Sequence, residues 1–341
     1  MSKKRIVVLG SNFAGFTAAV SLKSQVGSLH DVTVISRLAQ FVFHPSLVRL
    51  PLGARTAQQA HFPVHGLLAE HGIAFRNEAA IRLDLEGRKV ITATAEERYD
   101  FLVIATGARP NYAAVPGLGP RGYTHSIVTL PEAELARDAF EDFVRAPGPV
   151  VIGDVQGSPC RALGYEFLLN LALALDRRGL SKAVALTHLT SGPPIAAGPF
   201  EVIAHAAVAE IGPGQIALAD GRRLPFAFSM LLPSFLGVDV VRACEKITDA
   251  SGFVRINAFH QSLSFSEVFA AGDAASAQPL ERSGYLAEQS AQAVARNIAA
   301  CLRGQPMEPI PALPATAGGW LDSESEAAWA KHAFERYFPA A

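Results

Sequence analysis

The chain has 341 residues, of which 50% are hydrophobic and 18% charged, and its formal net charge is −1. This composition excludes a disordered chain and gives no electrostatic basis for binding nucleic acid, and the length is sufficient for two domains. The three cysteines, Cys160, Cys244 and Cys301, form no CxxC pair and no metal-ligand spacing, so neither a disulfide scaffold nor a metal site is expected.

The first predicted elements form a dinucleotide-binding turn. Residues 6–9 (IVVL) are a predicted buried strand, and a helix of small apolar residues follows. Gly10 and Gly15 take the first and third glycine positions of the G-x-G-x-x-G pattern, in which helix amides face a pyrophosphate, and Asn12 replaces the middle glycine. The predicted cofactor contacts of this turn are Gly10, Asn12, Phe13, Ala14 and Gly15.

A second strand, 30–36, completes the βαβ unit. Where dinucleotide folds usually place an acid for the ribose, this strand ends in Ser36 and Arg37. Ser36 can hydrogen-bond a ribose, and Arg37 can lie over an adenine or a phosphate or else be solvated. The segment FVFHPS, which contains Pro45 as a further predicted contact, lacks the cysteines that a flavin-dependent disulfide reductase carries there.

Two further glycine turns are predicted on strands far apart in the chain. A helix at 63–71 is followed by a small meander with strands at 78–83 and 89–94, in which Ala80 is a further predicted contact. The run 99–110 is a predicted buried strand that turns at Thr106 and Gly107, and Ala105, Thr106 and Gly107 are predicted contacts. This ATG turn is typical of flavoproteins with two dinucleotide-binding domains. Downstream, the strand before Gly272 and Asp273 offers a carboxylate for ribityl hydroxyls and amides for a flavin phosphate. The three turns together predict bound FAD.

The second domain is predicted between these turns, and its own turn is altered. Residues 148–153 are a predicted strand and 163–177 a long helix, joined by GDVQGSPC. We expect Val155 to fill the space that a pyrophosphate needs and Asp154 to place a negative charge beside it, so no tight NAD(P)H site is predicted. Cys160 falls in the first turn of the predicted helix, where the helix dipole favours a thiolate. Such a thiolate, facing a flavin, can take up sulfur as a persulfide and pass two electrons through a covalent adduct; an inert buried cysteine is the alternative.

Here the chain resembles the sulfide:quinone oxidoreductase family, and the related flavocytochrome c sulfide dehydrogenase flavoprotein, within the FAD-dependent pyridine nucleotide-disulfide oxidoreductase superfamily. The resemblance rests on VVLGSNFAGFTAA, FVFHPSL, VVIGDVQGSPCRALGYEFLLNL, FSMLLPSFLGVD, FAAGDAA, SGYLAEQSAQAVARNI and WAKHAFERYF. It implies that Cys160 carries the persulfide and that Glu166 is a nearby carboxylate. It also implies that Gly284 and Tyr285 lie at the flavin pyrimidine and Lys331 near the isoalloxazine.

The chain also departs from the family pattern. The segment 309–321 lacks the family's second redox cysteine, and Val128 and Glu132 stand where the family has a cysteine and a histidine. A mechanism with two protein thiols is therefore not predicted. At the C-terminus, 325–338 is a predicted amphipathic helix with an aromatic face. In the family such a face helps to seat the protein on the membrane near the quinone, whereas docking on its own domain is the alternative.

The sequence thus predicts an α/β protein with two Rossmann-like domains and a C-terminal amphipathic helix. We assign 1–110 and 241–308 to the FAD-binding domain, 111–240 to the second domain and 309–341 to the tail. The expected function is oxidation of sulfide or a related sulfur compound with a quinone as acceptor. An NAD(P)H-dependent quinone or ferredoxin-type reductase and a flavin-binding protein without turnover are the alternatives. No segment approaches the ~20 apolar residues of a membrane span, so a cytoplasmic protein, with peripheral membrane contact left open, is expected.

Overall fold

The computed structural model describes residues 2–276 and 282–311, which form two compact units. Unit 1 comprises residues 2–42, 62–109 and 236–311, and unit 2 comprises 43–61 and 110–235. Residues 43–61 thus belong to unit 2, although they were assigned to the FAD-binding domain from the sequence; the functional division into domains stays a prediction. The predicted C-terminal helix, with Lys331, lies outside the described residues.

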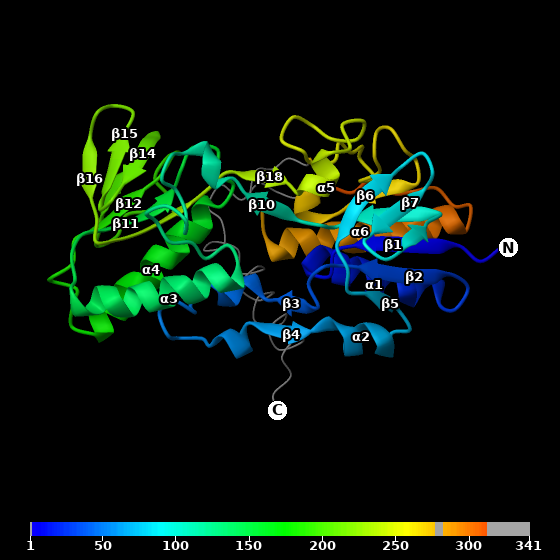
Figure 1. Cartoon of the computed structure of the whole chain (residues 1–341), viewed down its shortest axis with the longest axis horizontal. Coiled ribbons are helices and arrows are strands. Elements are labelled where there is room, and N and C mark those ends of the chain that lie inside the picture. The colour runs from blue at the N-terminus through cyan, green and yellow to red at the C-terminus, as the bar shows by residue number, and fades with distance from the viewer. Residues whose placement is uncertain (1, 277–281, 312–341) are drawn as a thin grey trace. The chain divides into compact units, whose positions relative to one another are not determined.

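Unit 1 is built on a five-stranded parallel sheet with the strand order β19-β9-β1-β2-β5, of which Figure 1 labels β1, β2 and β5. Its strands are β1 (Arg5–Leu9), β2 (Asp31–Ile35), β5 (Ala74–Arg76), β9 (Phe101–Ile104) and β19 (Val268–Ala270). The central strand β1 is apolar at four consecutive positions because both faces of a parallel sheet are covered.

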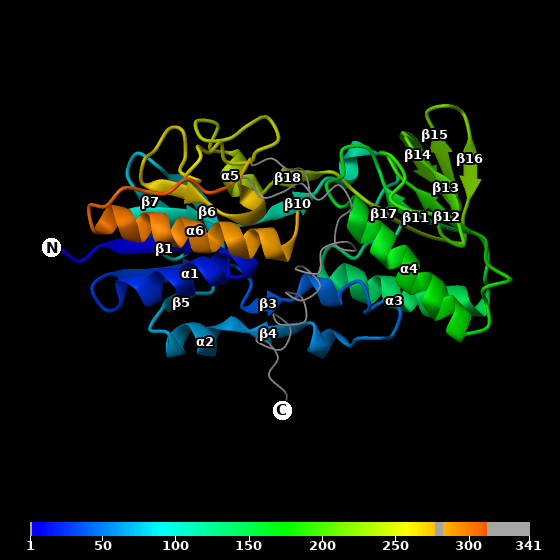
Figure 2. The same cartoon turned by 180° about the vertical axis from the view of Figure 1, so that it is seen from behind.

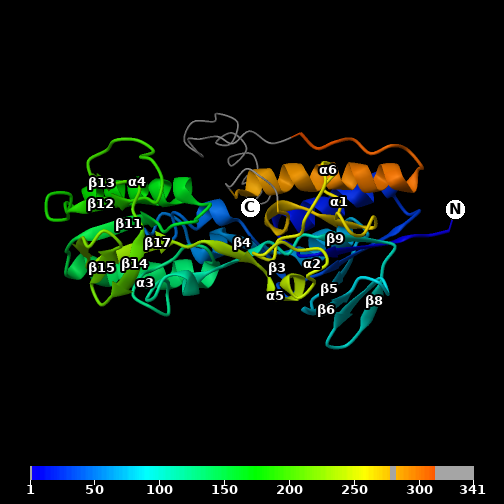
Figure 3. The same ribbon diagram turned by 90° about the horizontal axis from the view of Figure 1, so that it is seen from above.

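Two long helices, α1 (Phe13–Val26) and α6 (Gly284–Leu302), lie side by side on one face of this sheet (Figure 3). Their buried sides are rich in alanine, which lets the two backbones approach closely. The other face packs against the antiparallel sheet β6 (Ala80–Asp84), β7 (Lys89–Thr92) and β8 (Glu96–Arg98) and against the segment that begins with α5 (Asp239–Arg242). The smaller elements are α2 (Val64–Glu70) and the paired strands β3 (Gln40–Val42) and β4 (His61–Pro63).

Unit 2 has a four-stranded parallel sheet in the order β13-β12-β11-β17. The strands are β11 (Val150–Asp154), β12 (Leu186–Leu189), β13 (Glu201–Ile203) and β17 (Phe228–Leu232). Helices α3 (Leu130–Arg145) and α4 (Arg161–Arg177) cover one face (Figure 2), and the antiparallel strands β14 (Val208–Gly212), β15 (Gln215–Leu218) and β16 (Arg223–Pro225) cover the other. Strands β10 (Ala108–Pro110) and β18 (Phe235–Gly237) pair with each other where the chain passes between the units.

The predicted α/β class with two Rossmann-like folds is confirmed. The structure refines two helix starts. Pro63 is the N-cap residue of α2 rather than part of its first turn, and α4 begins at Arg161, two residues before its predicted start. The helix predicted at 325–338 is not tested, because those residues are not described.

A histidine lies in the core of unit 2 without polar partners. His188, on β12, is fully buried, and in the described part of the chain neither ring nitrogen has a hydrogen-bond partner. Its ring packs edge-on against Tyr165 and Phe200. Desolvation, aided by the charge of Arg161, lowers the pKa of His188 to about 4. The folded state therefore holds this imidazole neutral.

We expect His188→Leu to weaken the pH dependence of stability. Because the pKa of His188 is lower in the folded protein than the ordinary value near 6.5, the unfolded chain binds more protons between those values, and stability falls as the pH falls. From pH 7 to pH 5 this one group should cost about 2 kcal/mol. Urea unfolding of the protein at both pH values measures the difference. The matched control is His65→Leu, because His65 is exposed. An unchanged pH dependence in His188→Leu would contradict the prediction.

Candidate functional site

The three predicted glycine turns of unit 1 lie together at the carboxyl edge of its parallel sheet. Strand pairing sets Leu9 opposite both Ile35 and Ile104, and Ile104 opposite Ala270, so the chain leaves β1, β9 and β19 at the same level. Backbone bonds continue this register, since Ala105 N donates to Leu9 O and Ala271 N donates to Ile104 O. Residues more than 250 positions apart in the sequence thus border one edge, where ligands of open parallel sheets bind.

The glycines of this edge are required by close packing. Gly10 has a φ of 108°, and a Cβ there would overlap the carbonyl oxygen of Ala105. A Cβ at Gly15 would overlap the carbonyl oxygen of Gly10, so α1 starts directly against the turn. Gly272 has a φ of 59° and a Cβ there would lie 2.8 Å from the Cβ of Ala14. The turn and the start of α1 are therefore packed closely against each other, as in dinucleotide folds whose first helix amides face a phosphate.

Polar groups of the other two turns complete the edge. The hydroxyl oxygen of Thr106 is buried and has no hydrogen-bond partner among the described residues, as expected of a group that awaits a ligand. Asp273 lies in the short 3₁₀ helix Gly272–Ala274, with Arg282 Nη1 3.9 Å from its Oδ1. Desolvation raises the pKa of Asp273, and Arg282 opposes the shift. Arg282, whose guanidinium also lies 4.1 Å from the centre of the Phe253 ring, was not singled out in the sequence.

The predicted ribose contacts at the end of β2 are held by local hydrogen bonds. Ser36 Oγ lies 3.0 Å from Ser11 Oγ and accepts from the backbone N–H of Leu38 at 3.2 Å. The side-chain amide of Asn77 donates to the carbonyls of Ser36 and Arg37. Arg37 itself is exposed. This loop is therefore fixed beside the glycine turn of β1, to which Ser11 belongs.

The remaining predicted contacts are placed differently. Gly284 and Tyr285 form the first turn of α6, which Ser283 caps by accepting from Leu286 N at 3.2 Å. Ala80 starts β6, in the antiparallel sheet that packs on the opposite face from α1. Pro45 lies in the 3₁₀ helix His44–Ser46 of unit 2, and Lys331 is outside the described residues. The structure thus brings together Gly10, Asn12, Phe13, Ala14, Gly15, Ser36, Arg37, Ala105, Thr106, Gly107, Gly272 and Asp273.

In unit 2, Cys160 is the N-cap residue of α4 and lies just outside the helix, so its predicted place in the first turn was wrong by one position. Its backbone N–H donates to Ser158 Oγ at 3.3 Å, and its carbonyl accepts from Gly164 N at 3.3 Å. The thiol is partly exposed. A cysteine at this position lies beside the unpaired amides of the first helical turn, which favour an anion.

In the turn before Cys160, Val155 and Asp154 do not take the positions predicted for them. Val155 is fully buried in the core between β11 and the β14–β16 sheet, so it does not fill the pyrophosphate space. Asp154 is also fully buried, and its Oδ2 accepts from both the backbone N–H and the hydroxyl of Ser191, at 3.0 and 2.6 Å. Desolvation raises the pKa of Asp154 while the Ser191 hydrogen bonds oppose the shift. Asp154 is therefore a structural link to the loop after β12.

Arg161 ties the same loop to the start of α4. Its Nε donates to Thr190 Oγ1 at 3.2 Å, and Nη2 donates to the carbonyl of Pro193. Together with the Asp154–Ser191 bonds, this side chain holds the loop after β12 near the ends of β11 and β12, the region where a nicotinamide dinucleotide would lie in a Rossmann fold. Sequence analysis missed Arg161, although an arginine directly after the cysteine could have drawn attention.

Glu166, in the second turn of α4, is the second predicted catalytic residue. Desolvation raises its pKa, and the charge of Arg49 opposes the shift. Arg49 belongs to the segment 43–61 that folds with unit 2. A carboxyl with a raised pKa can exchange a proton more readily near neutral pH.

Comparison with known proteins identifies the family. A profile of the family described as pyridine nucleotide-disulphide oxidoreductase matches residues 4–153. The sulfide-quinone reductase of Aquifex aeolicus (strain VF5) is 30% identical in an alignment of 349 positions, gaps included. The alignment covers 92% of this chain and 80% of that protein. The chain belongs to the sulfide:quinone reductase family.

The chain is also similar to a solved structure of this family and to an NADH dehydrogenase-like protein. The crystal structure of the sulfide:quinone oxidoreductase from A. aeolicus superimposes with a TM-score of 0.83 at 29% identity, covering 89% of this chain and 78% of that one. An NADH dehydrogenase-like protein of Mycobacterium tuberculosis (strain CDC 1551 / Oshkosh) is 26% identical over 300 residues, 80% of this chain and 73% of that protein. As a member of the family, the chain is an FAD-dependent oxidoreductase, and the carboxyl edge of unit 1 fits the dinucleotide part of FAD.

None of the helices among the described residues is both long and apolar enough to span a membrane. In residues 2–276 and 282–311, no group of three or more histidine, cysteine, aspartate or glutamate side chains is arranged to hold a metal ion.

Proposed function

We propose that this protein oxidises sulfide, or a related sulfur compound, at Cys160 and passes the electrons by way of FAD to a quinone. The observation that carries the proposal is a partly exposed cysteine at the N-cap of α4, within a chain of the sulfide:quinone reductase family. Bound FAD supplies a two-electron acceptor and a route to the quinone.

The residues of unit 2 supply the sulfur chemistry. The thiolate of Cys160 and a hydrosulfide ion react to give a persulfide on Cys160, and this reaction releases one proton and two electrons. A sulfur–sulfur bond forms and the S–H bond of hydrosulfide breaks. Atoms and charge balance when bound FAD accepts the two electrons. The amides at the start of α4 stabilise the anionic sulfur before and after this step. Glu166, with its raised pKa, is the proposed proton acceptor for the hydrosulfide.

The residues of unit 1 bind the cofactor in this proposal. Amides at the start of α1 hold the pyrophosphate, the Thr106 hydroxyl donates to FAD, and Asp273 accepts from its ribityl hydroxyls. Contact with a membrane surface, from which a quinone would be taken, is part of the proposal and rests on the sequence of 325–338.

Anaerobic titration of the FAD-loaded protein tests this function against a nicotinamide-dependent reductase. We expect sulfide to bleach the oxidised flavin band and a soluble quinone to restore it. NADH and NADPH should bleach the band far more slowly than sulfide does. The reason is that the Asp154–Ser191 and Arg161–Pro193 contacts close the second dinucleotide site in this proposal.

Each result has a clear meaning. Bleaching by NADH with none by sulfide would favour the reductase. No bleaching by either reagent would favour a flavin-binding protein without turnover. The double variant Asp154→Ala/Arg161→Ala distinguishes a second dinucleotide site that these contacts close from a site that has no affinity for NADH. If the contacts close the site, NADH should bleach the flavin of the double variant.

A further inference from the structure

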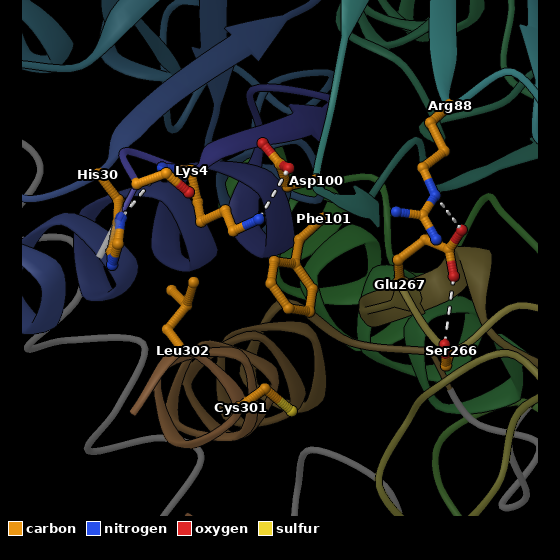
Figure 4. A pocket seen from close by; sticks show the side chains of 10 residues that line it. Lys4, His30, Arg88, Asp100, Phe101, Ser266, Glu267, Cys301 and Leu302 are labelled. Atoms are coloured by element: carbon orange, nitrogen blue, oxygen red, sulfur yellow. Dashed lines mark hydrogen bonds and ion pairs between the residues drawn. The ribbon is translucent and has the colours of Figure 1, made fainter. Parts of the chain in front are cut away.

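A cavity of ≈ 450 Å³ opens at the amino-terminal edge of the unit 1 sheet, opposite the glycine turns (Figure 4). Because the strands are parallel, their first residues gather here: Lys4 precedes β1, Phe101 begins β9 and Glu267 precedes β19. Arg88, from the turn between β6 and β7, borders one side, and the last turn of α6 borders another with Cys301. Nothing in the proposed reaction uses this cavity.

The acidic groups of the cavity are already engaged. Asp100 Oδ2 accepts from the backbone N–H of Arg5 at 2.9 Å and lies 3.4 Å from its Nε, and Oδ1 lies 3.3 Å from Lys4 Nζ. Glu267 Oε1 lies 2.7 Å from Arg88 Nε, and Oε2 accepts from Ser266 Oγ at 3.3 Å. The desolvation of Asp100 favours its neutral form, but the bonds from Arg5 and Lys4 hold its pKa below the ordinary value. Each of the two carboxylates is therefore already paired with a basic side chain, Asp100 with Lys4 and Glu267 with Arg88.

The basic groups, in contrast, retain donors. Lys4 Nζ has three N–H groups and bonds only Asp100 among the described residues. Arg88 pairs with Glu267 through Nε, and within the same described set no bond uses its two terminal nitrogens. His30 Nδ1 accepts from the backbone N–H of Lys4 at 3.2 Å, so the neutral ring carries its proton on Nε2 as a donor.

The arrangement of these donors over an apolar surface suggests a ligand. Figure 4 shows the ring of Phe101 between the Lys4–Asp100 pair and the Arg88–Glu267 pair, with Leu302 also at the wall. Of the residues that line the cavity, Lys4 and Arg88 are basic and Asp100 and Glu267 are acidic, and the unused N–H groups of Lys4 and Arg88 are the donors that an added anion would engage. We propose that this cavity binds a small organic anion, whose carboxylate head is held by Lys4 and Arg88 and whose apolar body lies on Phe101 and Leu302.

Cys301 provides a direct readout of occupancy. Cys301 is a partly exposed residue that lines the cavity, and desolvation raises the pKa of its thiol. Cys244 in the same unit is also partly exposed, with its pKa raised by desolvation, but it does not line the cavity. Alkylation of both thiols by iodoacetamide at mildly alkaline pH, followed by peptide mass spectrometry of the FAD-loaded protein, therefore has an internal control.

We expect benzoate to slow alkylation of Cys301 at least threefold without affecting Cys244. Benzamide, which has the same shape and no charge, should give no protection. Arg88→Gln and, separately, Lys4→Gln should each remove most of the protection by benzoate. Retained FAD absorbance and an unchanged rate at Cys244 show that each variant is folded.

Three outcomes would overturn the proposal. Equal protection by benzoate and benzamide would mean that charge plays no part. Protection by inorganic phosphate without protection by benzoate would mean that the apolar wall plays no part. Absence of protection by any probe, in a protein whose Cys301 is alkylated at a measurable rate, would mean that the cavity binds no anion of this class.

Discussion

Cys160→Ser should abolish reduction of the flavin by sulfide while leaving FAD bound. A serine hydroxyl keeps the size of the side chain at the N-cap of α4 but cannot take up sulfur, so the rate should fall by on the order of 10³-fold or more. Stopped-flow measurement of the flavin band after anaerobic mixing with sulfide gives the rate directly. Because serine is a favourable N-cap residue, the stability of the protein should not fall.

Matched controls distinguish this role from a general need for thiols. Cys244→Ser and Cys301→Ser remove partly exposed cysteines of unit 1 and should leave the rate within about twofold of the wild-type value, a difference of less than 0.5 kcal/mol. Retention of rapid bleaching in Cys160→Ser would refute the proposed role of Cys160. A large loss in Cys244→Ser or Cys301→Ser would point to a second redox thiol.

Glu166 was carried over from the resemblance alone, and the structure adds a physical property to it. The raised pKa follows from desolvation within unit 2, to which Arg49 also belongs. Arg49 lies more than 100 residues earlier in the chain, so no local pattern could connect the two residues. Glu166 could therefore be predicted from the sequence, but the desolvation and the nearby charge of Arg49 that set its pKa could not.

The parts of the fold that were predicted correctly are those that local patterns determine. The apolar run before Gly10 and the spacing to Gly15 specify a strand, a tight turn and a helix whatever lies elsewhere. Parallel strands place their carboxyl ends at one edge of a sheet. Once the turn at Thr106 and Gly107 and the turn at Gly272 and Asp273 were each recognised, their proximity could therefore be predicted. Gly272, packed against α1 and α6, is an example.

The parts that were predicted wrongly depend on the direction of a side chain. Val155 and Asp154 were expected to spoil a phosphate site, but which face each side chain takes is set by packing that no local pattern reveals. Val155 turns into the core beneath the β14–β16 sheet, and Asp154 bonds Ser191, which lies 37 positions later. His188 is a similar case, since its burial without polar partners depends on Tyr165 and Phe200 from other elements.

Gly10→Ala should cost FAD affinity and stability together. The added methyl group overlaps the carbonyl oxygen of Ala105, a backbone atom that strand β9 holds in place, and alanine is strained at a φ of 108°. The combined penalty should be about 3 kcal/mol or more. Since the displaced turn also carries the amides that face the pyrophosphate, the dissociation constant for FAD should rise by roughly 100-fold. Equilibrium binding of FAD to the apoprotein and urea unfolding measure the two effects.

Gly66→Ala is the matched control for this change. Gly66 lies in α2 of the same unit, exposed, and a Cβ there would meet no atom within 4 Å. Because alanine favours a helix interior over glycine, this variant should bind FAD normally and gain up to about 1 kcal/mol of stability. If Gly10→Ala bound FAD as tightly as Gly66→Ala, the glycine turn of β1 would not be the pyrophosphate site. The cofactor would then have to be held by groups other than the first amides of α1.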